Sequence, residues 1–302
     1  MKINSSLVML FCLTVVFSPV SAQTPPDFSK VEISTAQVAN GVYMLMGMGG
    51  NIGASVGADG TFIIDDQFAP LSDKITAALA RISDQPLRFI INTHWHGDHT
   101  GGNENLANTG AIIMAQDNVR LRMSRENVMK LFNRTIPPAP AGALPIVTFN
   151  DGVTVFLNGH EIRIRHLANA HTDGDSIVYF KDVDVIHTGD IFFNGIYPVI
   201  DLDSGGSING IIKAVEAILA LADDNTKFIP GHGPLGGKQD LIAYHDVLVK
   251  VRDRVQGLMA QGKSLEQIQA MKPNADLDPT WGTGMITPNV ILQVVYESLK
   301  KQ

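Results

Sequence analysis

The sequence of 302 residues is almost without cysteine and has no surplus of basic residues. Cys12 is its only cysteine, and 23 lysines and arginines face 30 acidic residues, a formal net charge of −7. A single thiol cannot form a disulfide within one chain, and it cannot build a zinc site of several thiolates. The acidic balance argues against nucleic acid as a general partner, because phosphate binding depends on lysine and arginine.

The sequence also has no apolar run long enough to cross a bilayer. Residues 7–17 form an apolar stretch, whereas a membrane-spanning helix needs about 20 such residues. Lys2 precedes the stretch, and small residues ending at Ala22 follow it, which is the pattern of a secretory signal peptide. We therefore expect residues 1–22 to be a signal peptide and residues 23–302 to be one domain. The domain is expected to be exported across the inner membrane to the periplasm, without stable membrane insertion.

The mature chain would contain no thiol at all, because removal of the signal peptide removes Cys12. This excludes thiolate catalysis and suits an oxidising compartment, where nothing can mispair. What remains has the composition of a folded protein, with 45% hydrophobic residues, 18% charged residues and 28 glycines. Nothing in the sequence indicates the oligomeric state.

Strand-like and helix-like segments alternate along the chain. The segments predicted as strands are residues 42–46, 51–57, 61–65, 88–92, 111–115, 153–157, 161–167, 176–180, 183–187 and 227–229. Apolar spacing predicts helices over residues 71–81, 116–132 and 207–221, and the C-terminal part is predicted to be helical. Residues 134–146 contain four prolines and are predicted to form a surface loop. This α/β alternation favours two sheets covered by helices.

The strongest chemical signal is the segment HWHGDH at residues 94–99, which directly follows a predicted strand. The first two histidines, two positions apart at a strand end, can point at one ion. The glycine then lets the chain turn, so that the aspartate and the last histidine face a second ion. Imidazole and carboxylate ligands without thiolate suit zinc, with iron or manganese as alternatives.

Other candidate ligands follow later strands. His171, Asp190 and His232 each come after a predicted strand, and binding sites are commonly mounted on loops at such positions. His187 is interpreted either as a structural residue or as one that orients Asp190. Three more histidines are interpreted as solvated side chains without a functional role: His160, His166 and His245.

The segment at residues 94–99 resembles the H-x-H-x-D-H signature of the metallo-β-lactamase superfamily. The resemblance extends over nearly the whole chain, because Asp65, His171, Asp190 and His232 match later and earlier markers in the family's order. It implies the α/β fold of that family, an αββα sandwich in which two mixed sheets are flanked by helices. The metals would lie at one edge, between the sheets.

The resemblance also implies a role for each site residue. One metal ion would be held by His94, His96 and His171, and the other by Asp98, His99 and His232, with Asp190 bridging the two. Asp65 would accept the second N–H of a histidine ligand. Two zinc ions would share a water and lower its pKa, and the resulting bridging hydroxide would attack a carbonyl. Asp98 would orient this nucleophile and pass a proton to the leaving group.

The substrate is less constrained than the chemistry. Asp190 stands where many β-lactamases of the family have cysteine, and Phe193 where they have a lysine for the substrate carboxylate. In this respect Asp190 resembles the thioesterase-like and lactonase-like branches, such as glyoxalase II. Export instead favours β-lactams. Residues 134–146 are a candidate lid, and the side chains expected to line the substrate pocket are Phe68, Trp95, Phe192, Phe193, Ile196 and Tyr197.

The leading hypothesis is a zinc-dependent hydrolase of β-lactams or related cyclic amides and esters. A hydrolase of small-molecule thioesters or lactones is the first alternative. The second is an iron-dependent sulfur oxidoreductase, as in the persulfide-dioxygenase branch, although a complete ligand set for two ions argues against its single iron. The third is a non-catalytic envelope protein that buffers zinc or binds a partner. The position of the ligands at strand ends and Asp98 as a non-redundant ligand argue against it.

Overall fold

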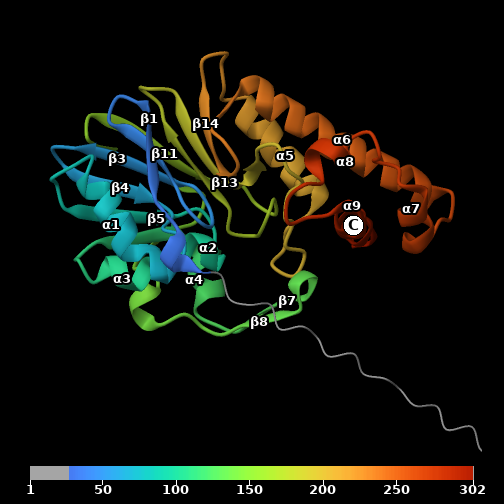
Figure 1. Ribbon diagram of the computed structural model, residues 1–302, viewed down its shortest axis with the longest axis horizontal. Helices are drawn as coiled ribbons and strands as arrows, with labels where there is room; N and C mark the ends of the chain where they lie inside the picture. Colours follow the sequence, from blue (N-terminus) through green and yellow to red (C-terminus); the bar gives the residue numbers. More distant parts are fainter. Residues whose placement is uncertain (1–26, 302) are drawn as a thin grey trace, which may run out of the picture.

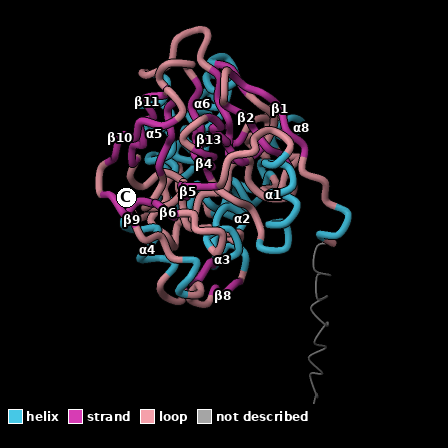
Figure 2. The backbone as a smooth tube through the Cα atoms, turned by 90° about the vertical axis from the view of Figure 1, so that its left-hand side faces the viewer, coloured by secondary structure: helices cyan, strands magenta, loops and turns pink. Residues whose placement is uncertain are grey.

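Two mixed β-sheets with helices on their outer faces form the described part of the chain in this computed structural model, residues 27–301 (Figure 1). The predicted signal peptide and residues 23–26 lie outside the described residues. The predicted α/β sandwich of four layers is therefore confirmed. In the view of Figure 2, strands β4 and β5 lie near the middle and β10 and β9 at the left edge, while α1 lies at the right and α3 and α4 lie below.

The first sheet has seven strands in the order β1-β2-β3-β4-β5-β6-β9. Their bounds are β1 Ser34–Ala39, β2 Val42–Met46, β3 Ile52–Gly57, β4 Gly60–Ile64, β5 Leu87–Asn92, β6 Ile112–Gln116 and β9 Val147–Phe149. The strands β1 to β4 form an antiparallel meander, whereas β4, β5, β6 and β9 run parallel. The carboxyl ends of β4 and β5 consequently lie at the same edge of the sheet.

The second sheet has six strands in sequence order. Their bounds are β10 Gly152–Leu157, β11 His160–His166, β12 Ser176–Phe180, β13 Val185–Phe193, β14 Lys227–His232 and β15 Gly236–Gly237. The pair β13–β14 is parallel and the other pairs are antiparallel. Since Phe193 pairs with His232, these two parallel strands also end together.

The helices divide between the two outer faces (Figure 1). On the side of the first sheet lie α1 Ser72–Ala80, α2 Gly97–Thr100, α3 Asn103–Ala107 and α4 Asp117–Met123. On the side of the second sheet lie α5 Ile208–Leu219, α6 Lys238–Ala260, α7 Leu265–Met271, α8 Asp278–Trp281 and α9 Pro288–Lys300. The short 3₁₀ helices are η1 Phe28–Lys30, η2 Ala69–Leu71, η3 Lys130–Phe132 and η4 Ala141–Ala143.

Three apolar layers hold these elements together. Between the sheets, Phe62 of β4 and Phe180 of β12 meet edge to face, with ring centroids 6.5 Å apart. A second layer joins α1 to the outer face of the first sheet, through residues such as Ile75 and Ile63. A third joins α5, α6 and α9 to the second sheet. Burying apolar surface on both faces of each sheet supplies the main driving force for this arrangement.

The predicted helix over residues 116–132 is wrong in its second half. The helix α4 ends at Met123, and the chain then forms a separate hairpin of β7 (Asn127–Met129) and β8 (Arg134–Ile136). The Asn127 amide donates to the carbonyls of Arg122 and Arg125, at 2.7 and 2.9 Å, and so satisfies groups that a longer helix would have used. The predicted loop over residues 134–146 is accordingly part hairpin and part 3₁₀ helix.

A capping box begins α7 in the C-terminal part of the chain. Ser264 Oγ accepts from the N–H of Gln267 at 3.3 Å, and the Gln267 side chain accepts from the N–H of Ser264 at 3.0 Å. The helix α9 begins with Pro288 in its first turn, where the missing N–H of proline costs no helical hydrogen bond. In the range 27–301, no helix combines the length and the hydrophobicity that crossing a membrane requires.

Candidate metal centre

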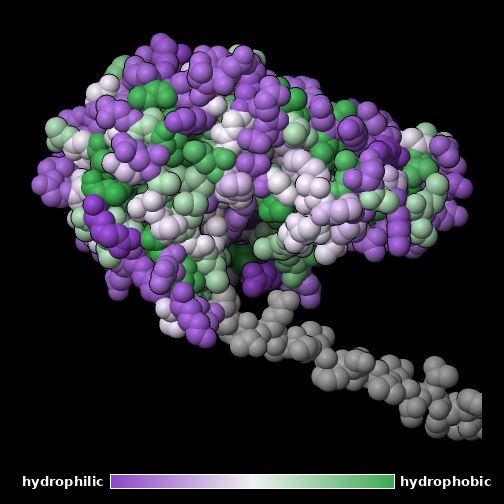
Figure 3. Space-filling model, turned by 45° about the horizontal axis from the view of Figure 1, so that its top comes forward, coloured by the Kyte–Doolittle hydropathy of each residue, from purple (hydrophilic) through white to green (hydrophobic). Residues whose placement is uncertain are grey.

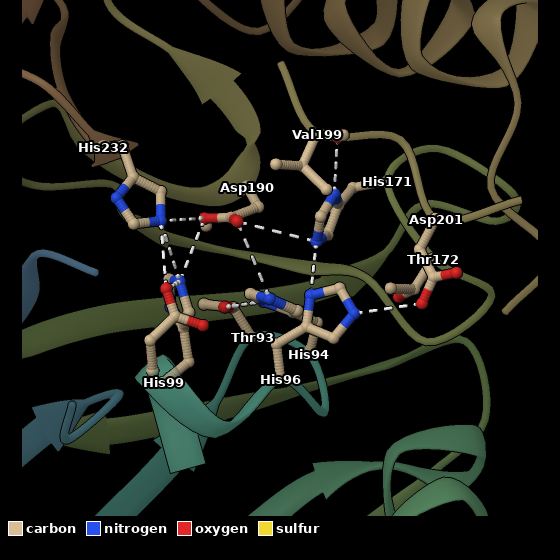
Figure 4. Close-up of polar contacts among 12 residues, drawn as sticks. Thr93, His94, His96, His99, His171, Thr172, Asp190, Val199, Asp201 and His232 are labelled. Atoms are coloured by element: carbon tan, nitrogen blue, oxygen red, sulfur yellow. Dashed lines mark hydrogen bonds and ion pairs between the residues drawn. The ribbon is translucent and has the colours of Figure 1, made fainter. Parts of the chain in front are cut away.

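Four chain segments that are far apart in the sequence meet at one edge of the two sheets (Figure 4). They are the 94–99 segment after β5, the β11–β12 loop with His171, strand β13 with Asp190, and the end of β14 with His232. All seven predicted metal-ligating residues are therefore brought together. The placement of Asp190 on a loop is wrong, because β13 continues to Phe193 with every residue buried.

The local fold of the 94–99 segment separates its ligands into two directions. His96 has extended backbone angles and directly precedes α2, whose first residue is Gly97. The N–H groups of His99 and Thr100 donate to the His96 carbonyl, which closes the first helical turn. Asp98 and His99 thus leave from the helix while His94 and His96 leave from the strand end. The turn is a helix start and does not need a left-handed glycine at Gly97.

The first group of ligand atoms, here called the three-histidine cluster, consists of His94, His96 and His171. His96 Nδ1 lies 2.8 Å from His171 Nε2. One carboxylate oxygen of Asp190, Oδ2, lies 3.8 Å from His94 Nε2 and 3.5 Å from His171 Nε2. The three histidines and Asp190 are all buried.

The second group, here called the mixed cluster, consists of Asp98, His99 and His232. Asp98 Oδ2 lies 3.7 Å from His99 Nε2 and 3.3 Å from His232 Nε2. The other oxygen of Asp190, Oδ1, lies 3.1 Å from His99 Nε2 and 3.5 Å from His232 Nε2. Asp190 therefore turns one oxygen to each cluster, which is the geometry of a bridging carboxylate.

Asp65 positions ligands of both clusters from behind. Its Oδ2 accepts from His99 Nδ1 at 2.8 Å and from the Thr93 hydroxyl at 2.7 Å, and its Oδ1 accepts from the Thr93 N–H at 2.7 Å. Because the Thr93 hydroxyl donates to Asp65, it accepts from His94 Nδ1, 3.0 Å away. The predicted role of Asp65 as a partner of a ligand histidine agrees with these contacts.

Asp201 holds His96 in the same way, although the sequence predicts no role for this residue. His96 Nε2 donates to Asp201 Oδ2 at 3.0 Å, while Oδ1 accepts from the N–H groups of Asp203 and Ser204 at 3.1 Å. His171 Nδ1 donates to the Val199 carbonyl at 2.7 Å. Asp201 belongs to no recognisable motif, and only the folded chain brings it beside His96.

These outer contacts fix which ring nitrogens face the centre without a proton. Each outer nitrogen of His94, His96 and His171 donates to an oxygen, so each inner nitrogen of the three-histidine cluster presents a lone pair. Two such lone pairs, on His96 and His171, face each other at 2.8 Å and would repel without a cation between them. His94 Nε2 is buried and has no hydrogen-bond partner. The site therefore fits metal ions, with imidazole and carboxylate as the donor set.

Electrostatics differ between the two clusters. Burial, together with the charge on His99, lowers the pKa of His94 well below its usual value, and burial lowers the pKa of His171 to about 4. In the mixed cluster, burial alone would lower the pKa of His232. The carboxylates of Asp190 and Asp98 outweigh burial and raise this pKa to about 9. Burial alone would raise the pKa of Asp98, but His99 and His232 outweigh burial and hold this pKa at about 2.

Two glycines allow the segments to approach this closely. A Cβ at Gly231, directly before His232, would collide with Asp190 Oδ1. A Cβ at Gly50 would collide with the ring of His99. Any larger residue at either position would move a ligand, so both glycines belong to the structure of the site.

The remaining histidines have structural partners. His187 Nε2 donates to the Asn51 carbonyl at 3.1 Å and thereby links the two sheets, while its Nδ1 accepts from the Gly189 N–H. Of its two interpretations the structural one agrees with these contacts. The interpretation of His160 as solvated is wrong, because it is buried and packs edge to face on Phe180. His166 and His245 are partly buried and hydrogen bonded, so they are not simply solvated either.

A cleft of about 750 Å³ opens over the ligands, and Figure 3 shows the surface hollowed between the two sides of the molecule. Phe68, Trp95, Phe193, Ile196 and Tyr197 line it, as predicted. The ring of Phe193 stacks on His232, with centroids 5.2 Å apart. Residues 136–140 of the predicted lid also line the cleft.

Phe192 was predicted beside these residues but points the other way. Strand alternation turns its side chain into the core, where it packs against Phe228 and Tyr244. Of these two neighbouring residues of β13, Phe193 therefore faces the cleft and Phe192 faces the core. The two aromatic residues look equivalent in the sequence, and only their alternating directions separate them.

Comparisons with known proteins agree with this architecture. Residues 52–234 match the family described as the metallo-beta-lactamase superfamily. Curated relatives include "Metallo-beta-lactamase type 2" of Bacteroides fragilis, 24% identical over 69% of this chain and 82% of the relative. "Hydroxyacylglutathione hydrolase" of a Polaromonas species is 27% identical over 54% of this chain, which spans 55% of that relative.

Solved structures show the same fold at low sequence identity. A metallo-beta-lactamase from Pontibacter korlensis has a TM-score of 0.58 and 16% identity, covering 72% of this chain and 99% of the other. A stereoselective inverting sec-alkylsulfatase from a Pseudomonas species has a TM-score of 0.64 and 18% identity, covering 88% of this chain and 50% of the other. At these identities the likeness concerns the fold.

Proposed function

The chain belongs to the metallo-beta-lactamase superfamily and is a metal-dependent hydrolase, and from this premise we propose that it works with two zinc ions on β-lactams or related cyclic amides and esters. The observation that supports the proposal most directly is the position of Asp190. Its two oxygens face two separate clusters of ligand atoms, each within 3.1 to 3.8 Å. A carboxylate in this position suits a pair of ions better than a single one.

The roles of the site residues follow from their places. Two divalent ions, when bound, lower the pKa of a shared water and polarise a carbonyl oxygen. His94, His96 and His171 would hold one ion, Asp98, His99 and His232 the other, and Asp190 both. Asp98 is partly exposed to the cleft, with 27% of its side chain accessible, so it can orient the attacking water and return its proton to the leaving group.

The cleft supports a compact and largely apolar substrate. Aromatic and aliphatic side chains form most of its walls, and ordinary small-molecule sites have this character. The relative from Bacteroides fragilis is named a metallo-beta-lactamase, which favours β-lactams as the first substrates to test.

Thioesters or lactones form the second candidate substrate class. Asp190 favours them, because a carboxylate at this position resembles the glyoxalase II-like branch. The relative named hydroxyacylglutathione hydrolase points in the same direction. A hydroxide-type attack on a carbonyl serves both classes, so the same ligand set would be used.

We also propose export. Residues 1–22 have the sequence of a signal peptide, and their removal would leave residues 23–302 as one domain without cysteine. The periplasm would be the location of the mature enzyme, where β-lactams are encountered. Sequencing the amino terminus of the protein recovered from the periplasmic fraction tests this, and a retained Met1 would contradict it.

The function is tested on purified mature protein loaded with zinc. Zinc per chain is measured on the same sample that is offered a chromogenic β-lactam, a lactone and a thioester. The expected result is two zinc ions with turnover of at least one class, and no turnover for His96→Ala. One iron per chain with oxygen uptake would instead support a sulfur oxidoreductase, and tight zinc binding without any turnover would support a storage protein.

A further inference from the structure

The β7–β8 hairpin places one arginine over the cleft with nothing to neutralise it. Arg134 lines the cleft and is exposed, and within residues 27–301 its side chain has no ion pair or hydrogen bond. The cleft has a second arginine, Arg122, but an ion pair already neutralises its charge. Arg122 pairs with Asp173 at 2.6 Å and donates to the Asp203 carbonyl at 3.4 Å.

The hairpin that carries Arg134 is held in place by side chains of the second sheet's loops. The N–H of Lys130 donates to Asp203 Oδ2 at 2.8 Å, and Lys130 Nζ lies 3.1 Å from Asp203 Oδ1. Beyond the hairpin, the N–H of Ala139 donates to the Met123 carbonyl at 2.8 Å. Asn133 turns the chain in a left-handed conformation directly before Arg134. These contacts fix the backbone from which Arg134 extends.

The charges around the cleft are distributed unevenly. Outside the metal centre, Glu104 of α3 is the acidic residue among the described lining residues, and it lies near Gly142 without pairing with Arg134. At the end of β13, Phe193 stacks on His232 and contributes no charge. An anionic group on a bound substrate is therefore attracted to the unpaired Arg134 at the hairpin and repelled by Glu104 on the α3 side.

We propose that Arg134 is a specificity-determining residue, which binds a carboxylate that the substrate carries away from its scissile bond. This inference rests on the proposed function of the metal centre and adds to it a substrate class, namely anionic molecules with an apolar body. The carboxylate points toward the hairpin, and the apolar body packs against Trp95, Ile136 and Phe193. Arginine suits this task because its planar group donates two parallel hydrogen bonds to a carboxylate.

The test uses binding as well as turnover, on zinc-loaded mature protein. α,ω-Dicarboxylates of graded length and monocarboxylates of equal length are titrated into the wild type, Arg134→Gln and Arg125→Gln by calorimetry. Arg125 is the matched control, because it is exposed just before the same hairpin, has no side-chain partner and does not line the cleft. Both variants lose one positive charge from the same region of the surface.

The wild type is expected to bind the best-fitting dicarboxylate about three- to fivefold more tightly than its monocarboxylate, and added salt should reduce the preference. Arg134→Gln should lose the preference and Arg125→Gln should keep it. For any hydrolysed substrate, Arg134→Gln should raise KM for the free acid and leave KM for its methyl ester and kcat unchanged.

No preference in the wild type at any length, or the same preference in Arg134→Gln, would overturn the assignment. Equal losses in both variants would show general attraction by surface charge and would also overturn it. A clear preference without hydrolysis of any substrate would contradict the proposed function while the binding role of Arg134 remained. The two proposals therefore fail separately.

Discussion

The three-histidine cluster and the mixed cluster share Asp190 but differ in their access to solvent. In the three-histidine cluster the side chains of His94, His96 and His171 are 1%, 8% and 0% exposed. In the mixed cluster His99 is 0% exposed, but Asp98 and His232 are 27% and 23% exposed. The first cluster is enclosed, and burial lowers the pKa of His94 and of His171. The second opens into the cleft and is surrounded by carboxylates. Closed metal sites favour retention of the ion, and open ones admit substrate.

This difference indicates a division of labour. The three-histidine cluster provides a fixed point, because Thr93, Asp201 and the Val199 carbonyl orient its rings. The mixed cluster carries Asp98, the one ligand with a chemical role beyond coordination in the proposed reaction. Four experiments test whether the two clusters differ in this way.

The largest effect is expected from His96→Ala in the enclosed cluster. Loss of this ring removes a metal ligand. It also removes the N–H group that donates a hydrogen bond to the buried Asp201 carboxylate. Activity at saturating zinc should fall by far more than about a hundredfold, the upper range for losing a mere positioning partner. Hydrolysis rates and zinc per chain are measured together. Retention of two zinc ions with substantial activity would contradict the assignment of His96.

Asp98→Asn should separate chemistry from coordination in the mixed cluster. The amide keeps the shape but cannot accept and return a proton, so kcat should fall roughly a hundredfold or more. Since Asp98 is one of three ligands there, the enclosed cluster should retain its ion. The comparison of kcat with zinc content at fixed pH provides the test, and an unchanged kcat would remove Asp98 from the reaction.

Asp201→Asn should weaken zinc binding and leave the turnover of the zinc-loaded enzyme unchanged. The amide is a poorer acceptor for His96 Nε2, so zinc affinity of the enclosed cluster should fall about tenfold to a hundredfold. Excess zinc should restore activity, which a defect in folding would not allow. Asp203→Asn is the control from the same loop, because its side chain contacts Lys130 and no histidine. Loss of activity that zinc cannot restore would contradict this role.

The smallest expected difference is in the pH at which each ion leaves. A protonated imidazole cannot bind metal, so zinc competes with protons wherever the pKa is high. The pKa of His232 is raised to about 9, and as the pH falls below that value protons compete increasingly for the mixed cluster. His171, with its pKa lowered to about 4, stays neutral until much lower pH. Bound zinc after dialysis at graded pH should fall in two steps, and a single step would contradict the comparison.

Much of the fold and of the site could be predicted, because those signals are local. The HWHGDH segment depends on spacing within six residues, and the order of Asp65, His171, Asp190 and His232 is visible in the chain itself. Strands such as β2 and β12 were predicted to the residue, since alternation and turn residues bound them.

What could not be predicted depends on contacts between distant segments. The end of α4 depends on the hydrogen bond that the Asn127 amide donates to the Arg122 carbonyl. The extension of β13 to Phe193 depends on its burial on both faces. Asp201 contacts a histidine 105 residues away, which no local pattern indicates. Phe192 and Phe193 differ only in the face of the strand to which each points.

The central claim is that hydrolysis depends on two ions shared through Asp190. The direct measurement is a titration of metal-free protein with zinc, in which bound zinc per chain and hydrolysis are followed on the same sample. The account predicts that turnover rises in full only as the second zinc binds and reaches its maximum at two per chain. Full activity at one zinc per chain, or a single bound iron with oxygen uptake and no hydrolysis, would contradict it.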